Sequence, residues 1–392
     1  MIPAHRVSTF GVSIFAEMSR LAVEKKAINL GQGFPDFDGP EEVKAAAIAA
    51  IRAGDNQYAV SNGQPALRRA IAAHSRRFYQ QEFDPENEIT VTSGATESNF
   101  SAILGLVNPG DEVIIFEPAY DSYVPDTLMA GGVPRYVPLY APTPEQPTWH
   151  FDPAELAAAF NPATRLIVLN TPHNPTGKIF SSDELAIIAA LCVRWDVIAL
   201  CDEVYEHLVY DGARHQRLAQ QPGMAGRTVT ISSLGKTFGL TGWKVGWTLA
   251  QPPLTAAVRA AHQWVTFATS TPFQAAGAAA LALDNEYYQS LASALQARRD
   301  FLVGVLRDMG LTVSVPGGTY FIMADFTPLG IQGVSDDVGF CRWLIETLGV
   351  AAIPPTVFYS DAHKHLGSHW VRFAFCKKME TLEAAALRLK KL

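Results

Sequence analysis

The sequence has little that would mark a secreted, membrane-spanning or nucleic-acid-binding protein. Its start, MIPAHRVSTFGVSIFAEM, lacks a basic segment followed by an unbroken apolar run, so we expect no secretory signal there. No stretch reaches the ~18 uninterrupted apolar residues of a spanning helix. No run of lysine and arginine exceeds a pair and the formal charge is -7, so nucleic acid is not an expected partner.

Cysteine is also scarce. The four cysteines lie far apart in the chain, at Cys192, Cys201, Cys341 and Cys376. This spacing suits neither a disulfide framework nor a zinc site, and we expect reduced, buried thiols in a cytosolic protein. Three histidines gather at His363, His365 and His369, but no carboxylate or cysteine accompanies them at a fixed spacing. We therefore predict no metal site.

The remaining composition is that of a globular enzyme. Hydrophobic residues make up 48% of the 392 residues and charged residues 18%, which leaves ample material for a core. The length suits one large domain and one smaller domain. We predict an N-terminal arm over residues 1–40 that belongs with the small domain, a large domain over 41–283 and a small α+β domain over 284–392.

Short apolar runs alternate with helical segments from residue 88 onward. Strands are predicted at Ile89–Thr92, Glu112–Phe116, Arg135–Leu139, Arg165–Leu169, Val197–Cys201, Val229–Ile231 and Trp247–Ala250. Helices are predicted at Ser98–Val107, Ala154–Phe160, Asp183–Arg194 and Leu254–Phe267. This alternation predicts an α/β fold with a mostly parallel seven-stranded sheet covered on both faces, and ligands bind beyond the carboxyl ends of such strands.

The two ends of the chain follow another pattern. Before the sheet, helices are predicted at Phe15–Ala27, Glu41–Ala53 and Leu67–Tyr79, and loops at Asn29–Asp38 and Asn56–Pro65. After residue 284, a charged helix at Glu286–Met309 precedes strands at Leu311–Val315 and Thr319–Asp325. A helix at Val338–Leu348, strands at Val350–Ile353 and Trp370–Phe375, and a last helix complete the prediction.

Polar residues follow several of the predicted strands. Asn170 and Asn174 lie in a loop with two prolines and a glycine, which is either a plain turn or a pair of amides aimed at a ligand. Asp202 ends an apolar run, and because a buried unpaired charge is costly we expect a cationic partner for it. A helix cap or a structural ion pair would also explain Asp202.

A lysine comes directly after another of these strands. Lys236 lies among small residues within TVTISSLGKTFGLTGWKVGW (residues 228–247), a position expected for a reactive lysine and less so for a solvated one. A nucleotide-binding phosphate loop would need glycine where Thr230 stands, so that interpretation fails.

A helix start can supply an anion site. The small residues of Ser93-Gly94-Ala95-Thr96 expose backbone N–H groups at a predicted helix start, where the alternative is a simple N-cap. Ser233 and Lys244 can complete a phosphate cradle. An anion site, a buried carboxylate, a phenol, two amides and a lysine together match the chemistry of pyridoxal 5'-phosphate, which is the predicted cofactor.

The sequence resembles the class I, fold-type I aminotransferases over nearly its whole length. The segments that carry the resemblance are NLGQGFPDFD (29–38), TSGATE (92–97), NTPHNPTGK (170–178), DEVY (202–205), SLGKTFGLTGWKVGW (233–247) and VRFAF (371–375). Within the family it is most similar to the methionine aminotransferase branch, near the kynurenine and glutamine aminotransferases. The resemblance implies an aspartate-aminotransferase-like fold.

The resemblance also implies roles for the residues around the cofactor. Lys236 would form the Schiff base and shuttle a proton, Asp202 would keep the pyridine nitrogen protonated, and Tyr205 would bind the phenolate oxygen. The other implied cofactor-binding residues are Gly94, Ala95, Thr96, Tyr120, Asn174, Ser233 and Lys244. Aspartate aminotransferases carry arginine at the position of Lys244, which affects cofactor affinity more than chemistry.

For the substrate, the resemblance implies that Arg372 clamps the carboxylate with help from Asn170, and that Gly33 leaves room for it. Phe15, Tyr58 and Phe267 would form an apolar side-chain pocket, with Tyr58 and Phe267 reaching into the partner subunit of a homodimer.

We therefore expect transfer of the amino group of methionine and other apolar or aromatic amino acids to a 2-oxo acid by a ping-pong reaction. Kynurenine or glutamine transamination and β-elimination from cysteine conjugates are the alternatives on the same scaffold. A cofactor-binding regulator would need a DNA-binding module, and the arm before Asn29 is too short and too weakly basic to supply one.

Overall fold

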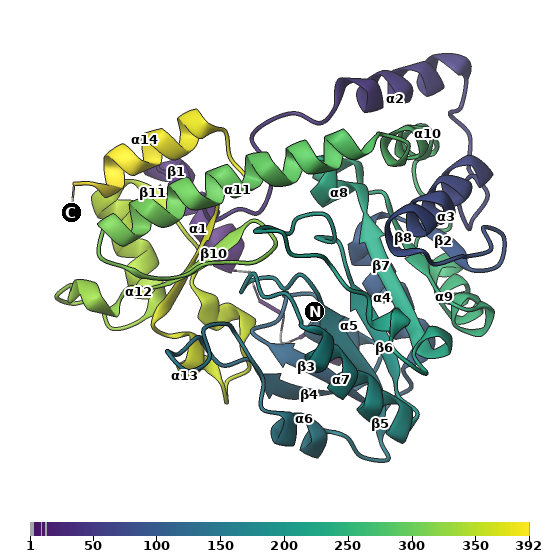
Figure 1. Ribbon diagram of the computed structural model, residues 1–392, viewed down its shortest axis with the longest axis horizontal. Helices are drawn as coiled ribbons and strands as arrows, with labels where there is room; N and C mark the ends of the chain where they lie inside the picture. Colours follow the sequence, from purple (N-terminus) through teal and green to yellow (C-terminus); the bar gives the residue numbers. More distant parts are fainter. Residues whose placement is uncertain (1–3, 9, 12–13, 392) are drawn as a thin grey trace.

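The computed structural model describes residues 4–8, 10–11 and 14–391. A seven-stranded sheet forms its centre, in the order β2-β8-β7-β6-β5-β3-β4 (Figure 1). The strands are β2 (Ile89–Thr92), β3 (Glu112–Glu117), β4 (Val133–Pro138), β5 (Thr164–Asn170), β6 (Ile198–Asp202), β7 (Thr228–Ser233) and β8 (Gly246–Leu249). Only β8 runs antiparallel to its neighbours, β2 and β7. The predicted α/β fold with a mostly parallel seven-stranded sheet is thus confirmed.

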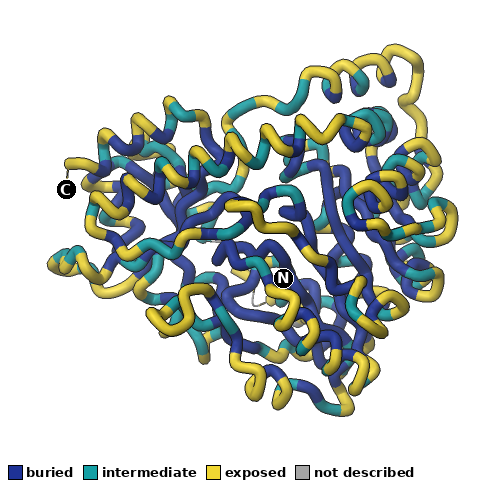
Figure 2. The backbone as a smooth tube through the Cα atoms, in the orientation of Figure 1, coloured by how far each residue is buried: buried dark blue, intermediate teal, exposed yellow. Residues whose placement is uncertain are grey.

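Successive residues of the central strands face opposite sides of this sheet, because side chains alternate along a strand. Ile114 of β3 packs with α6 (Pro153–Ala159) and α7 (Ser182–Trp195). Its neighbour Ile115 packs with α4 (Gly94–Leu106), α5 (Tyr123–Met129) and α9 (Pro252–Val265). The central strands are therefore buried on both faces, as Figure 2 shows in dark blue, and this explains their continuous apolar sequences.

Three further helices cover the β2–β8 end of the sheet. They are α2 (Glu41–Ala53), α3 (Pro65–Tyr79) and α10 (Thr271–Leu281). Their apolar residues pack against Val91 of β2 and Trp247 of β8. At the opposite end β4 is an edge strand, and its outward-facing residues Val133 and Arg135 are more exposed than those of the central strands.

A second packing region contains two small sheets. Strands β9 (Thr312–Ser314), β10 (Phe321–Asp325) and β12 (Trp370–Ala374) form an antiparallel sheet in the order β12-β10-β9. Strand β1 (Ile28–Asn29) pairs in parallel with β11 (Val350–Ala351). The surrounding helices are α1 (Ile14–Glu24), the long α11 (Asn285–Asp308), α12 (Asp337–Trp343), α13 (Lys364–Gly367) and α14 (Met379–Leu389).

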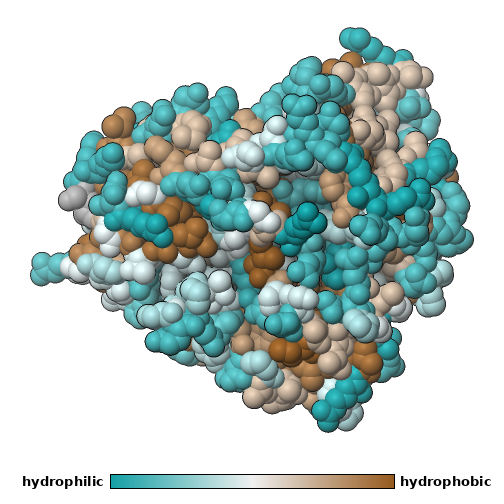
Figure 3. All heavy atoms as spheres, viewed as in Figure 1, coloured by the Kyte–Doolittle hydropathy of each residue, from teal (hydrophilic) through white to brown (hydrophobic). Residues whose placement is uncertain are grey.

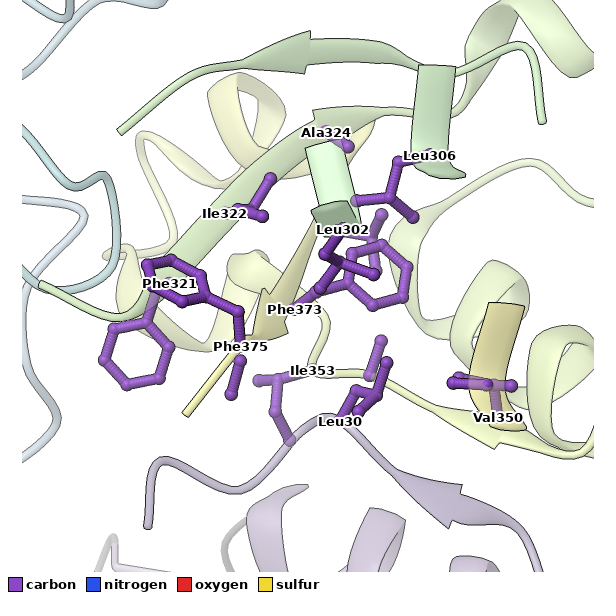
Figure 4. Close-up of a cluster of buried hydrophobic side chains, with 14 of the residues drawn as sticks. Leu30, Leu302, Leu306, Phe321, Ile322, Ala324, Val350, Ile353, Phe373 and Phe375 are labelled. Carbon is purple, nitrogen blue, oxygen red and sulfur yellow. The ribbon is translucent and has the colours of Figure 1, made fainter. Parts of the chain in front are cut away.

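This second region has its own core, shown in Figure 4. Leu30, from the segment after β1, lies close to Ile353 and belongs to the same core as Leu302 of α11, although both are more than 270 positions away in the chain. The N-terminal segment is thus packed with the C-terminal residues. We propose on this basis that the two packing regions are the large and small domains with boundaries near residues 40 and 284.

Four local predictions differ from the structure. Helix α4 begins at Gly94, directly after β2 and four residues before the predicted start. Gly94 has a left-handed φ of 76°, which glycine adopts without strain and which allows this sharp turn from strand to helix. Lys236 comes directly after β7 as expected, but it lies in a one-turn helix, α8 (Leu234–Thr237), that was not predicted. Helices α5 and α10 were not predicted; α10 reads TPFQAAGAAAL and has no polar face that would give a helical periodicity.

A cluster of buried charges lies beside β6 and β7. The guanidinium of Arg217 pairs with Glu203 at 2.9 Å and with Glu206 at 2.9 Å. His215 lies 3.0 Å from Glu203, and the side chain of Glu206 also accepts a hydrogen bond from Ser232. The side chains of this group are at most 2% exposed, so one buried guanidinium holds two buried carboxylates in place.

The outer surface in the view of Figure 3 is largely hydrophilic, with separate hydrophobic patches. No helix among the described residues is both long and apolar enough to cross a membrane.

Candidate active site

A cavity of about 190 Å³ opens at the carboxyl ends of β5, β6 and β7, next to the N-terminus of α4. The residues predicted for the cofactor all line it: Gly94, Ala95, Thr96, Tyr120, Asn174, Asp202, Tyr205, Ser233, Lys236 and Lys244. Asn170 lines it as well. The fold thus brings together residues from six separate segments of the sequence at the predicted edge of the sheet.

The amino group of Lys236 lies near two phenol rings, whose centroids are 5.2 Å apart. Its Nζ is 5.6 Å from the ring centroid of Tyr205 and 5.6 Å from that of Tyr320. Burial lowers the pKa of Lys236 to about 8, and the positive charges of Lys244 and Arg372 act in the same direction. A substantial fraction of Lys236 is therefore a neutral amine at mildly alkaline pH, which is the form able to attack a carbonyl.

The carboxylate of Asp202 is buried at the end of β6. Its Oδ2 accepts hydrogen bonds from Asn99 Nδ2 at 3.0 Å and from the hydroxyl of Tyr123 at 2.8 Å. Its Oδ1 accepts a longer bond of 3.3 Å from the backbone N–H of Val204. Among the described residues the hydrogen-bond donors to Asp202 are neutral groups, and the positive charge of Lys236 also favours the ionised carboxylate. The cationic partner expected from the sequence stays a prediction. Burial raises the pKa of Asp202, and the donors Asn99 and Tyr123 oppose that rise.

The opposite end of the cavity has the features of an anion site. Lys244 Nζ donates to Thr96 Oγ1 at 3.1 Å, beside the free backbone N–H groups in the first turn of α4. Gly246 lies behind this turn, and a Cβ on Gly246 would come within 2.5 Å of the carbonyl carbon of Gly94. Glycine at both positions therefore allows the helix start and β8 to approach closely.

The guanidinium of Arg372 is buried near the cavity. It donates to Asn174 Oδ1 at 3.0 Å and to the carbonyl oxygen of Gly31 at 3.0 Å, whereas its Nε has no hydrogen-bond partner. Three aromatic rings surround it, with centroids 4.0 Å away for Phe321, 5.0 Å for Phe358 and 5.3 Å for Phe15. Burial lowers the pKa of Arg372 to about 10, so the group stays charged at neutral pH.

The other predicted substrate residues have different surroundings. Asn170 donates to the carbonyl oxygen of Asp202 at 2.9 Å and accepts from the N–H of Asn174 at 2.7 Å, so its amide braces the loop that carries Asn174. A Cβ on Gly33 would come within 2.6 Å of the ring of Phe321. Tyr58 and Phe267 contact each other edge to face at 5.5 Å and do not line the cavity of their own chain.

Some cavity residues were not found by sequence reasoning, namely Asn99, Tyr123, Val204, Gly235, Thr241 and Val245. One of them shows a spacing that points to the site. Asn99 follows Thr96 by three positions on α4, and residues three apart share a helix face, so Asn99 lies on the side of Thr96. Tyr123 is the first residue of α5, and Tyr120 precedes that helix.

Histidines do not form a metal centre where they cluster in the sequence. His363 Nδ1 lies 2.6 Å from a carboxylate oxygen of Glu117. Among the described residues, one other group brings candidate ligand atoms together: His74, Glu206 and His207. The two histidine Nε2 atoms of this group are hydrogen-bonded to each other at 2.8 Å, and Glu206 is already bound by Arg217 and Ser232. These atoms are engaged within the protein.

Comparison with known proteins decides the family. The family profile for aminotransferase class I and II matches residues 25–389. The chain belongs to the class I and II aminotransferases. It is therefore an enzyme that transfers amino groups, and its structure has the aspartate-aminotransferase-like fold predicted from the sequence.

Several relatives of this aminotransferase match it from end to end. A probable N-succinyldiaminopimelate aminotransferase of Mycobacterium tuberculosis is 46% identical over 99% of this chain and 98% of its own length, and the solved structure superposes with a TM-score of 0.94. The methionine aminotransferase of Escherichia coli is 40% identical over 100% of this chain and 99% of its own, with a TM-score of 0.93. A kynurenine–oxoglutarate transaminase of Dictyostelium discoideum is 41% identical over 100% of this chain and 96% of its own.

Aminotransferases of this family work with pyridoxal phosphate, and the residues of this aminotransferase fit that group. The turn at Gly94 and the lysine beside it can take a phosphate. Oδ1 of Asp202 accepts only a long hydrogen bond, so this oxygen can accept another from a protonated nitrogen. Lys236 lies in the same cavity, and its lowered pKa suits an amine that reacts with an aldehyde. The unpartnered buried Nε of Arg372 fits a substrate carboxylate.

Proposed function

We propose that this aminotransferase binds pyridoxal 5'-phosphate and moves the amino group of methionine and other apolar or aromatic amino acids to a 2-oxo acid. The observation that carries the proposal is Arg372, a buried guanidinium with a free Nε, enclosed by phenylalanine rings beside the cavity of Lys236. Such a site offers a charge for an α-carboxylate and apolar surface for a side chain.

The cofactor, when bound, supplies an electron sink for the carbanion at the substrate Cα. The protein holds its three ends in the proposed arrangement. The phosphate would be held by Gly94, Ala95, Thr96, Ser233 and Lys244. Asp202 would hold the protonated pyridine nitrogen, and Tyr205 with Asn174 would hold the phenolate oxygen. Tyr120 would cover the ring; its half-buried position on the cavity wall supports this role.

Lys236 is the group that moves the proton in this proposal. As a neutral amine its Nζ accepts the proton from the substrate Cα, and it would then donate this proton to C4′ of the bound cofactor. The rings of Tyr205 and Tyr320 both lie on one side of Nζ, at 5.6 Å from it. Arg372 holds the substrate carboxylate meanwhile, and its link through Asn174 joins the substrate site to the cofactor site.

The charges around the cavity support a substrate with an uncharged side chain. Lys236 and Lys244 are the basic residues that line the cavity in the described chain, and Arg372 adds a third cation near it. Each of these three cations has a role in the proposal, so none of them is left to bind a carboxylate in the side chain of the substrate. The aromatic rings of Phe15 and Phe358, 5.6 Å apart, offer contact to an apolar side chain.

Two other functions have specific support. The 46% identity to the Mycobacterium tuberculosis protein favours N-succinyldiaminopimelate, and the Dictyostelium discoideum relative favours kynurenine. β-Elimination from cysteine conjugates remains a third activity that the same scaffold could carry out.

The first test is the visible absorption spectrum of the purified protein with added pyridoxal phosphate. We expect a yellow band that methionine bleaches, with release of 4-methylthio-2-oxobutanoate. Bleaching by kynurenine or by N-succinyl-diaminopimelate, with no response to methionine, would keep the transaminase and change its substrate. Pyruvate and ammonia released from a cysteine conjugate without any 2-oxo acid would identify the lyase. A protein that retains no pyridoxal phosphate after the free cofactor is removed would contradict the proposal. Lys236→Ala, which lacks the amine for the Schiff base, serves as the control that releases no 2-oxo acid.

We also propose a homodimer with shared active sites. Tyr58 is 85% exposed and Trp264 is 87% exposed, and Phe267, which touches Tyr58, is 40% exposed. An exposed apolar group of this kind is typical of an interface. The four cysteines, all free and buried, support the reducing cytosolic location predicted from the sequence.

Subunit mixing tests the shared sites. Lys236→Ala and Tyr58→Ala protomers each have one defect. In a mixed dimer, one of the two sites combines the intact Lys236 of one protomer with the intact Tyr58 of the other. We expect the mixture to regain activity above the sum of the separate variants. A mixture that shows only that sum, after exchange of subunits has been verified, would contradict the shared sites.

A further inference from the structure

The hydrogen bonds to Asp202 are distributed unevenly over its two carboxylate oxygens. Oδ2 accepts from Asn99 at 3.0 Å and from Tyr123 at 2.8 Å, whereas Oδ1 has only the long contact of 3.3 Å from the N–H of Val204. Because both side-chain donors point at the same oxygen, they determine which way the carboxylate is turned.

The two donors come from different helices. Asn99 lies in the second turn of α4, the helix whose first turn lines the anion end of the cavity. Tyr123 is the first residue of α5 and its ring lies 5.6 Å from that of Tyr120. The elements that line the phosphate and ring positions of the cavity thus also hold Asp202.

The burial of the Asp202 carboxylate explains why it needs hydrogen-bond donors such as Asn99 and Tyr123. Asp202 is 3% exposed, and a carboxylate buried without a cation would be expected to become neutral. Hydrogen bonds to the ionised form favour it over the protonated form. Asn99 is 1% exposed and its Oδ1 has no hydrogen-bond partner, so its amide makes a single hydrogen bond, the one to Asp202. Tyr123 is 2% exposed, and burial and the neighbouring Asp202 raise its pKa, so its hydroxyl stays protonated and donates.

We propose that Asn99 and Tyr123 are positioning residues that keep Asp202 ionised and occupy its Oδ2, so that Oδ1 is the oxygen left to pair with the protonated pyridine nitrogen. This inference rests on the proposed binding of pyridoxal phosphate. Neither residue touches the reacting atoms in this arrangement; both act through Asp202. Their loss therefore weakens the electron sink and leaves the substrate carboxylate site at Arg372 unaffected.

The test uses Tyr123→Phe and Asn99→Leu in the full-length protein loaded with pyridoxal phosphate labelled with ¹⁵N in its ring. Tyr123→Phe removes one hydroxyl and keeps the ring beside Tyr120. Asn99→Leu removes the donor and an oxygen that has no partner. Tyr210→Phe is the matched control, because its hydroxyl is equally buried but donates to the backbone carbonyl of Thr319.

We expect the ¹⁵N signal of the wild type to be that of a protonated pyridine nitrogen, and the signal of each variant to shift toward that of an unprotonated one. We expect kcat to fall about tenfold in each variant, which corresponds to a decrease of roughly one unit in the pKa of the pyridine nitrogen. The KM for the amino donor should not change. The control should lose some thermal stability without moving the nitrogen signal. The double variant should show a larger shift than either single variant.

Two outcomes separate the inference from the proposed function. If the wild type takes up no pyridoxal phosphate, the proposed function fails. If the wild type binds it with a protonated nitrogen, and both single variants and the double variant keep the wild-type signal and kcat, the positioning role is overturned and the proposed function stands.

Discussion

The close approach of Gly246 to the start of α4 makes Gly246→Ala a sensitive probe of the anion site. The new Cβ would lie 2.5 Å from the carbonyl carbon of Gly94 and 2.7 Å from the nitrogen of Ala95. An ordinary contact is 3.4 Å or more, so the two segments would have to separate by about 0.9 Å. Gly246 cannot retreat easily, because its strand is paired on both sides, with Thr92 and with Ser233. The displacement therefore falls on the turn at residues 94–95.

The magnitude follows from the cost of overpacking. Forcing extra volume into a packed site costs about 1–3 kcal/mol. Because the displaced N–H groups are the proposed phosphate donors, we expect pyridoxal phosphate to bind about 10- to 100-fold more weakly, which corresponds to that free energy. The assay is titration of the cofactor-free protein, with thermal unfolding measured in parallel. Gly242→Ala is the control, since a Cβ there would meet nothing within 4 Å. Wild-type affinity in Gly246→Ala would refute the assignment of this turn to the phosphate.

The remaining predictions concern three charged residues. Arg217→Met leaves two buried carboxylates without their cation and should lower the free energy of unfolding by about 3–5 kcal/mol in urea titrations. In the control Arg135→Met, the lost ion pair with Glu112 involves a half-exposed guanidinium, so the free energy of unfolding should fall by less than about 1 kcal/mol. Arg372→Gln should raise KM for methionine about 100-fold, the worth of two charge-assisted hydrogen bonds, with little change in cofactor affinity; an unchanged KM would remove Arg372 from the substrate site. Because only the neutral amine of Lys236 reacts, the rate of cofactor uptake should rise with pH up to about 8 and then level off; a rate independent of pH below 8 would contradict the depressed pKa.

The sheet could be predicted from the sequence because its signal is local. Each central strand is a short run of β-branched and apolar residues that ends in a polar residue, as Leu166–Asn170 shows. The polar residues at those ends converge by the geometry of parallel strands alone. Helix α10 lacked such a signal, since alanine and glycine form a helix without an amphipathic pattern and packing on α2 and α3 supplies its stability.

The partners of Asp202 could not be predicted for a different reason. Asn99 is 103 residues away and Tyr123 is 79 residues away in the chain. The spacing of Asn99 from Thr96 places it on the side of the site but does not predict a contact with Asp202. The general rule that a buried charge needs a cation predicts nothing about these two contacts, because neutral donors meet part of the same need. The residue types of the site were therefore predictable, and the second layer of contacts behind them was not.

The arrangement of the site along the chain has a consequence for its order of synthesis. All seven strands of the central sheet and all ten cavity residues predicted for the cofactor lie between residues 89 and 249. Arg372 is made 128 residues after Lys244, and it donates to the carbonyl oxygen of Gly31, which is made near the beginning. A growing chain therefore contains every residue proposed for the cofactor well before it contains the arginine proposed for the substrate. The proposed substrate site is complete only when the last strand, β12, pairs with the first segment of the chain.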